Sequence, residues 1–186
     1  DNGASVFNYY TNFAGATLPS GWVVWDLPSG NNYSVNNGIT LSATSTDVAS
    51  IQYQKSSFNP QTNVFEFYGA IQTDGFQGFG ASPLNLTAIA TLDGNIAILT
   101  DKGALNYLLR AGGSTEVSFS TPVGSALYLM SMWESTTALY GTLNYKNQQS
   151  TTGGFTPETS LYLELDNAER DVSTSTEFIQ YVRVRA

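Results

Sequence analysis

Apolar and polar residues alternate along much of this chain, with the two-residue period that is typical of β-strands with one buried face. In the stretch 6–13, Phe7, Tyr9 and Phe13 would lie on one face of a strand, and Asn8 and Asn12 on the other. The same reasoning predicts further strands at 22–25, 39–43, 48–54, 64–71, 76–81, 115–119, 127–133, 139–145, 161–165 and 178–184.

The stretch 86–109 predicts a three-stranded antiparallel meander in the middle of the chain. Three short β-prone runs are separated by Asp93-Gly94 and Lys102-Gly103. Asp-Gly favours a type I′ turn because both central residues of that turn need a positive φ. Lys102-Gly103 is a looser form of the same turn signal.

The pattern as a whole predicts an all-β protein with almost no helix. No stretch of ten residues has a convincing helical period, and neither an internal repeat nor a linker divides the chain. About a dozen short strands separated by turn residues are typical of an antiparallel β-sandwich or jelly roll. We therefore expect one β-sandwich domain over residues 1–186, with 1–13 as a candidate for a strand exchanged between neighbouring molecules.

Composition narrows the classes of function. Charged residues make up only 12% of the chain and the net charge is −8, so the chain lacks the basic surface that nucleic acid or anionic lipid requires. The absence of His removes the commonest general base and metal ligand, and the absence of Cys excludes disulfides and thiolate sites. We expect no cofactor.

The sequence begins Asp1-Asn2-Gly3 and has no apolar run long enough to span a membrane. Together with few Lys, no Cys and many neutral polar residues, this start predicts a protein that is secreted or displayed at the cell surface after removal of a signal peptide.

Several short motifs resemble those of concanavalin A-like lectin and glucanase domains. The chain reads F-A-G-A-T-L-P-S-G-W at 13–22 and S-V-N-N-G-I-T-L-S-A at 34–43, and it ends L-Y-L-E-L-D-N-A-E-R at 161–170 and F-I-Q-Y-V-R-V-R at 178–185. The resemblance implies two stacked, curved antiparallel sheets. That superfamily includes lectins, glycosidases, polysaccharide lyases and adhesive modules, so the fold does not choose among them.

One motif has glycosidase-like spacing. Glu164, Asp166 and Glu169 form E-x-D-x-x-E, as in laminarinase-like members of the superfamily, where paired carboxyls can run a retaining mechanism. The motif lies in the second-to-last predicted strand, whereas those glycosidases carry theirs in mid-chain. In addition, Asn167-Ala168 lacks the apolar residues that the family motif has at those positions. We therefore interpret it as a strand end that leads into a charged turn, and we predict that the chain is not an enzyme.

A carbohydrate-binding module is the alternative function. Trp22 and Trp25 lie three residues apart on a strand and face opposite ways, so that one could stack on a sugar while the other joins Trp133 in the core. A Ca²⁺ ion could bind oxygen ligands from Asp74, Asp166 or Asp171, which are the candidates for that weaker prediction.

Two sequons, Asn32-Tyr33-Ser34 and Asn85-Leu86-Thr87, mark Asn32 and Asn85 as candidate N-glycosylation sites in a secreted protein. Asn32 is expected in a loop.

The function that we expect from these patterns is a structural subunit of an extracellular filament. Neutral faces rich in Thr, Asn, Gln and Tyr bring little charge to desolvate when subunits pack together. Size, composition and β content are similar to those of archaeal surface-filament subunits of the thread and cannula type. Copies of the chain would join by β-strand addition, through a subunit contact made by Val6, Phe7, Tyr9, Tyr10 and Phe13.

Overall fold

The computed structural model describes residues 6–45, 47–71, 76–84, 96–100, 106–112, 115–153, 156–168 and 174–186. The described residues form fifteen strands and no helix, which confirms the prediction of an all-β antiparallel fold. None of these segments is therefore a helix that could cross a membrane. The strands are β1 (Tyr9–Thr11), β2 (Trp22–Asp26), β3 (Asn31–Val35), β4 (Ile39–Ala43), β5 (Ala49–Tyr53), β6 (Val64–Ile71), β7 (Phe76–Ser82), β8 (Ile96–Thr100), β9 (Asn106–Ala111), β10 (Thr115–Pro122), β11 (Tyr128–Glu134), β12 (Leu139–Leu143), β13 (Lys146–Thr151), β14 (Tyr162–Ala168) and β15 (Ser175–Arg185).

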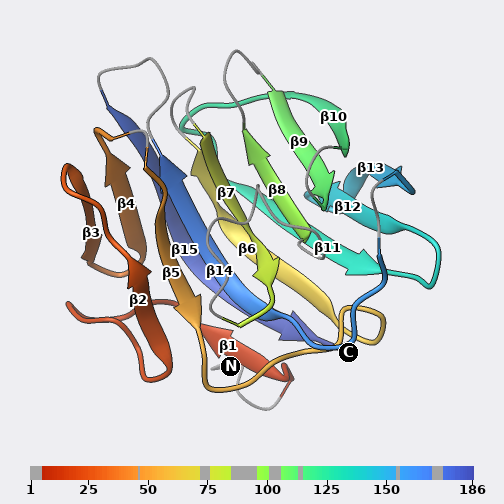
Figure 1. The fold of residues 1–186 in the computed structure, drawn as a ribbon, viewed down its shortest axis with the longest axis horizontal. Coiled ribbons are helices and arrows are strands. Elements are labelled where there is room, and N and C mark those ends of the chain that lie inside the picture. Colours follow the sequence, from red (N-terminus) through yellow and green to blue (C-terminus); the bar gives the residue numbers. More distant parts are fainter. Residues whose placement is uncertain are drawn as a thin grey trace.

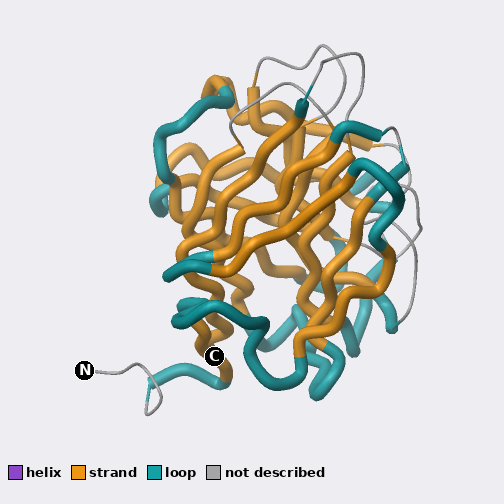
Figure 2. Tube along the Cα trace, turned by 90° about the vertical axis from the view of Figure 1, so that its left-hand side faces the viewer, coloured by secondary structure: helices purple, strands orange, loops and turns teal. Residues whose placement is uncertain are grey.

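Two antiparallel sheets are stacked face to face as a jelly-roll sandwich (Figure 1). The seven-stranded sheet has the order β10-β9-β8-β7-β14-β5-β2. The eight-stranded sheet has the order β13-β12-β11-β6-β15-β4-β3, and β1 pairs with β15 beside this path. Figure 2 shows the strands running through the body of the molecule. The last two strands of the chain thus lie inside the two sheets, β14 between β7 and β5, and β15 between β6 and β4.

The core lies between the sheets and is rich in aromatic side chains. Phe67 of the eight-stranded sheet stacks on Phe79 of the seven-stranded sheet, with ring centroids 6.0 Å apart. Near β1, Trp22 packs between Phe13 and Tyr53 at centroid distances of 5.2 and 5.8 Å. Aromatic residues bury large apolar areas on pleated faces, so these contacts stabilise the stacking of the two sheets.

Alternation explains which residues enter the core. In β4, Ile39, Leu41 and Ala43 are buried while the two residues between them are partly exposed. The register of β15 shifts between Ile179 and Tyr181, where a β-bulge changes the pairing with β6. Bulges re-aim side chains, and beyond this one Val182 and Val184 point into the core.

The predicted meander is present in part. β8 and β9 are antiparallel neighbours, and β7 and β10 extend the run on either side. Its first predicted run and both of its turns, 86–95 and 101–105, lie outside the described residues. The predicted N-terminal strand is shorter than expected, because only Tyr9–Thr11 pairs with β15.

Candidate active site

Two acidic side chains share the face of β14 that points away from the partner sheet. Leu163 and Leu165 belong to the core. Because successive side chains of a strand point to opposite faces, Glu164 and Asp166 lie together on the outer face of the seven-stranded sheet. Both are nevertheless fully buried, with no exposed surface.

Hydroxyl and amide groups of the flanking strands hold these two carboxyls. On β5, Gln52 is the register partner of Glu164, and Ser50 is that of Asp166. Gln52 Nε2 donates a hydrogen bond of 3.0 Å to Glu164 Oε2, and the hydroxyl of Ser82 donates to the same oxygen. Ser50 donates to Asp166 Oδ1. Each carboxyl is thus fixed by a polar neighbour on an adjacent strand.

Glycines occupy the register positions on the other side of the acids. In β7, Gly80 lies opposite Glu164, and Gly78 lies opposite Asp166. A Cβ at Gly78 would lie 2.8 Å from Leu99 Cβ, and one at Gly80 would collide with the carbonyl oxygen of Ile96. Glycine within a strand often marks a close approach of another group, and here β7 and β8 pack closely because these positions carry no side chain.

The surroundings of Glu164 disfavour the ionised form of its carboxyl. Burial raises the pKa of Glu164 well above the usual range of a glutamate, and the neighbouring charge of Asp166 raises it further. Glu164 Oε1 is buried without a hydrogen-bond partner among the described residues. The structure thus places a buried carboxyl that resists ionisation, Glu164, beside a second carboxyl, Asp166.

A third buried carboxyl approaches from the partner sheet. Glu177 of β15 is fully buried; burial raises its pKa well above the usual range, and the charge of Asp166 adds to that effect. The backbone N–H of Gly78 opposes this rise in pKa only in part, and neither carboxylate oxygen of Glu177 has a hydrogen-bond partner among the described residues. Residue patterns did not predict this acid, because on β15 it occupies an inward position that normally holds an apolar residue.

The other predicted sites are only partly brought together. The third acid of the E-x-D-x-x-E motif, Glu169, lies outside the described residues. So do Asp74 and Asp171 of the predicted Ca²⁺ site, and Asn85 of the second sequon. Within the described part of the chain no group of three acidic side chains is placed to hold a metal ion. Asp166, the remaining Ca²⁺ candidate, is hydrogen-bonded by Ser50.

The tryptophans and the first sequon are described. Trp22 is buried and its Nε1–H donates to Tyr9 at 2.6 Å, whereas Trp25 is 39% exposed. Trp133 was expected in the core, but it is half-buried and stacks on Tyr140 at 5.5 Å. Asn32 is exposed, as a glycan acceptor requires, but it lies in strand β3 and not in a loop.

The N-terminal residues that we assigned to a subunit contact belong to the chain's own fold. β1 pairs with β15 through Tyr9, Tyr10 and Thr11, and Phe13 is fully buried. Phe7 packs on the guanidinium of Arg183, 4.8 Å from its ring centroid. Of the proposed contact residues, only Val6 is largely exposed, at 62%.

Comparisons with known proteins establish the fold. No protein-family model and no curated protein matches the chain. Among solved structures, one from a study of endo-acting O-glycanases of the human gut microbiota aligns with a TM-score of 0.70 at 12% identity, covering 97% of this chain and 99% of that one. A Bacillus licheniformis β-glucanase aligns with a TM-score of 0.65 at 12% identity, covering 96% of this chain and 97% of that one. The catalytic domain of a Thermotoga petrophila endo-1,3-β-glucanase aligns with a TM-score of 0.64 at 9% identity, covering 97% of each chain.

The fold is therefore the concanavalin A-like jelly roll of glucanases, as the sequence motifs implied. The prediction of a filament subunit that is not an enzyme is wrong, since these structural neighbours are glycan-cleaving enzymes. The similarity to archaeal filament subunits is likewise unsupported. It depended on size, composition and β content, without a motif.

Residue patterns located two site acids but not the groups that hold them. Ser50 and Gln52 alternate with buried apolar residues in β5, and this alternation predicts a solvated polar face. In the structure both side chains are buried and hydrogen-bond to the acids of the neighbouring strand β14. The sequence does contain a signal for this contact. Ser50 and Gln52 are two residues apart on one strand, and Glu164 and Asp166 are two residues apart on another, so each pair lies on one face of its strand.

Proposed function

We propose that this protein is an endo-acting glycoside hydrolase whose reacting groups lie on the outer face of the seven-stranded sheet. The observation that carries the proposal is the pair Glu164 and Asp166: a buried acid with a raised pKa and an unpartnered oxygen, beside a second carboxyl. The glycan-cleaving enzymes that share the fold support it.

The two acids would divide the chemistry. The raised pKa of Glu164 favours its protonated form, which would donate its proton to the glycosidic oxygen as the bond breaks. Asp166 would face the positive charge that develops at the anomeric carbon and stabilise it as a carboxylate. Water would then add to that carbon and return a proton to Glu164. Because both side chains are fully buried, cleavage requires that the residues covering them move aside to admit the glycan.

The test is cleavage of soluble β-1,3-glucan, mixed-linkage β-glucan and mucin O-glycans, followed by product size and new reducing ends. Wild-type protein should release oligosaccharides from one of them. Glu164→Gln should lower the rate by about 100-fold or more, the usual contribution of a general acid, and Asp166→Asn should also lower it. Glu116→Gln is the matched control, because Glu116 is an exposed acid of the same sheet paired with Arg110 at 2.9 Å.

Folding must be measured beside activity. Glu164→Gln should be at least as stable as wild type at neutral pH, because the amide keeps an acceptor for Gln52 and Ser82 and removes a carboxyl that resists ionisation. Loss of activity with retained stability would assign Glu164 to the chemistry. If wild-type protein binds a glycan without cleaving any of the three, or if Glu164→Gln cleaves at the wild-type rate, the proposal is wrong.

A further inference from the structure

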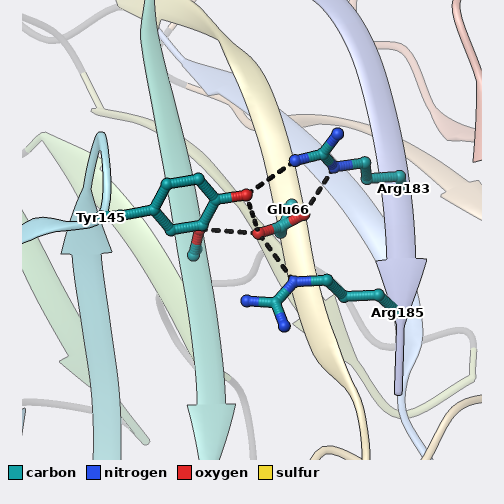
Figure 3. Close-up of polar contacts among 5 residues, drawn as sticks. Glu66, Tyr145, Arg183 and Arg185 are labelled. Carbon is teal, nitrogen blue, oxygen red and sulfur yellow. Dashed lines mark hydrogen bonds and ion pairs between the residues drawn. The ribbon is translucent and has the colours of Figure 1, made fainter.

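A buried acid on the opposite face of the sandwich organises a second cluster of polar side chains. Glu66 of β6 lies on the outer face of the eight-stranded sheet, and its side chain has no exposed surface. Arg183 Nε donates to its Oε2 at 2.5 Å, and Arg185 Nε donates to its Oε1 at 3.1 Å. Tyr145 OH and Ser131 Oγ also donate to Oε1, at 2.9 and 3.2 Å (Figure 3).

The sheet register explains why these groups meet. Arg183 is the direct partner of Glu66 on β15, and Ser131 is its partner on β11. Arg185 follows Arg183 by two positions and therefore points to the same face. The chain has only seven Lys and Arg in total, so two arginines against one buried acid make a local positive site in a protein of net charge −8.

Part of each guanidinium remains available. Nε of both arginines binds Glu66, and Arg183 Nη2 donates to Tyr145 OH at 2.7 Å. Arg183 Nη1 and both terminal nitrogens of Arg185 have no hydrogen-bond partner among the described residues, and in Figure 3 the terminal nitrogens of Arg185 point away from Glu66. The side chains of Arg183 and Arg185 are 19% and 39% exposed. The site thus offers fixed donors to a ligand.

Tyr145 contacts the cluster from a backbone conformation that is unfavourable for a residue with a side chain. It forms the two-residue turn between β12 and β13 with Asn144, and both residues have positive φ, 58° and 53°. Such turns favour Asn followed by Gly, because a side chain at the second position is strained. Tyr145 is also 55% exposed. Backbone strain at an exposed aromatic residue favours a role in binding over one in packing.

A tyrosine ring lies beside each guanidinium. Arg185 lies 5.9 Å from the ring centroid of Tyr145, and Arg183 lies 5.5 Å from that of Tyr181. Tyr68 and Tyr10 continue this row, at 5.1 and 6.0 Å from Tyr181. The apolar faces of pyranose rings pack on aromatic side chains, and the sugar hydroxyls can hydrogen-bond to the Tyr O–H groups.

We propose that this Arg183–Arg185 cluster binds an acidic saccharide: a sugar carboxylate of the uronic acid type is held by the free guanidinium nitrogens, and the sugar ring packs on Tyr145. Planar guanidinium forks match planar carboxylates. Glu66 is a positioning residue that holds the arginines. If the ion pairs of Glu66 with the two arginines served only to link β6 and β15, the site would need neither the free guanidinium nitrogens nor the exposed, strained Tyr145.

Calorimetric titration with oligogalacturonate tests the proposal directly, with neutral galacto-oligosaccharide and a sulfated galactan as comparison ligands. Wild-type protein should bind oligogalacturonate, and more weakly at high salt. Arg185→Gln should weaken binding by about tenfold or more, and Arg185→Lys should restore part of it because the charge returns without the fork. Lys55→Gln is the charge-matched control on another surface and should bind like wild type.

Tyr145→Gly separates binding from structure. Glycine relieves the backbone strain of the turn, so the thermal midpoint should stay near that of wild type or rise, whereas binding should fall. Calorimetry measures binding without cleavage, so failure of the hydrolase proposal and failure of this one are distinguishable. Absence of binding in wild type, equal binding of neutral or sulfated ligand, or unchanged binding in Arg185→Gln would overturn the proposal.

Discussion

At the scale of single residues, the environment of Glu134 disfavours the ionised form of its carboxyl. Its side chain is 3% exposed, its Oε2 accepts the backbone N–H of Glu158 at 2.9 Å, and its Oε1 has no partner among the described residues. Burial raises the pKa of Glu134 to about 7, and the charge of Glu158 adds to that rise. The folded protein therefore keeps a proton that the unfolded chain releases near pH 4.5.

This difference predicts the effect of Glu134→Gln. As the pH rises from about 4.5 to 7, the unfolded chain loses its proton first, so wild-type stability falls. Glutamine does not titrate but buries an amide, so we expect the variant to be more stable than wild type by about 1–2 kcal/mol at pH 8 and no more stable at pH 4. Urea unfolding at both pH values measures this. Asp26→Asn, at an exposed site, is the control; an equal gain at pH 4 would contradict the argument.

At the scale of elements, β1 is predicted to be essential to the monomer. It pairs with β15, Tyr9 accepts the Trp22 indole hydrogen bond, and Phe13 is fully buried just beyond the strand. Losing one buried Phe typically costs about 3–5 kcal/mol, which is comparable to the stability of a small domain. We expect deletion of residues 1–13 to give a chain without cooperative thermal unfolding. Val6→Ser should unfold like wild type; a folded, soluble deletion variant would refute the assignment.

Two strand glycines should differ in their tolerance of a methyl group. At Gly80 an added Cβ would run into the backbone of β8, lying 2.9 Å from Ala97 Cα. At Gly141 the nearest atom is Leu109 Cδ1 at 2.7 Å, which is the end of a side chain that can rotate. Gly80→Ala should therefore cost about 2 kcal/mol or more, and clearly more than Gly141→Ala. Denaturant midpoints decide this, and equal costs would show that β7 and β8 adjust to the extra atom.

The sequence predicted the positions of strands better than it predicted which strands pair with one another. Alternation located β4, β12 and the V-R-V-R end of β15 because the two-residue period is local. It did not predict that β14 and β15 lie inside the sheets, since strand order depends on contacts far apart in the chain. For the same reason Glu164 and Asp166 were found as a motif, but their burial against Ser50 and Gln52 was not. The turn at Tyr145 carries no glycine, so turn signals missed it.

At the scale of the whole molecule, the protein combines a net negative charge with buried acids that resist ionisation. Net charge is −8, so deprotonation in the folded state adds repulsion to an already negative molecule. Glu164 and Glu177 join Glu134 in having raised pKa values, for which burial is the largest cause. These acids come from both sheets, so their protonation couples to the packing of the sandwich as a whole.

We therefore predict that the global stability of this protein decreases between about pH 5 and pH 8. In that window the folded state binds more protons than the unfolded chain, so the free energy of unfolding must fall as the pH rises. Salt separates the two causes: repulsion among surface charges is screened in about 1 M salt, whereas the cost of ionising a buried carboxyl is not. Urea unfolding across this range should show a decline that persists in high salt and becomes shallower in Glu134→Gln. Constant or rising stability toward pH 8 would mean that Glu134, Glu164 and Glu177 ionise in the folded protein as readily as they do in the unfolded chain.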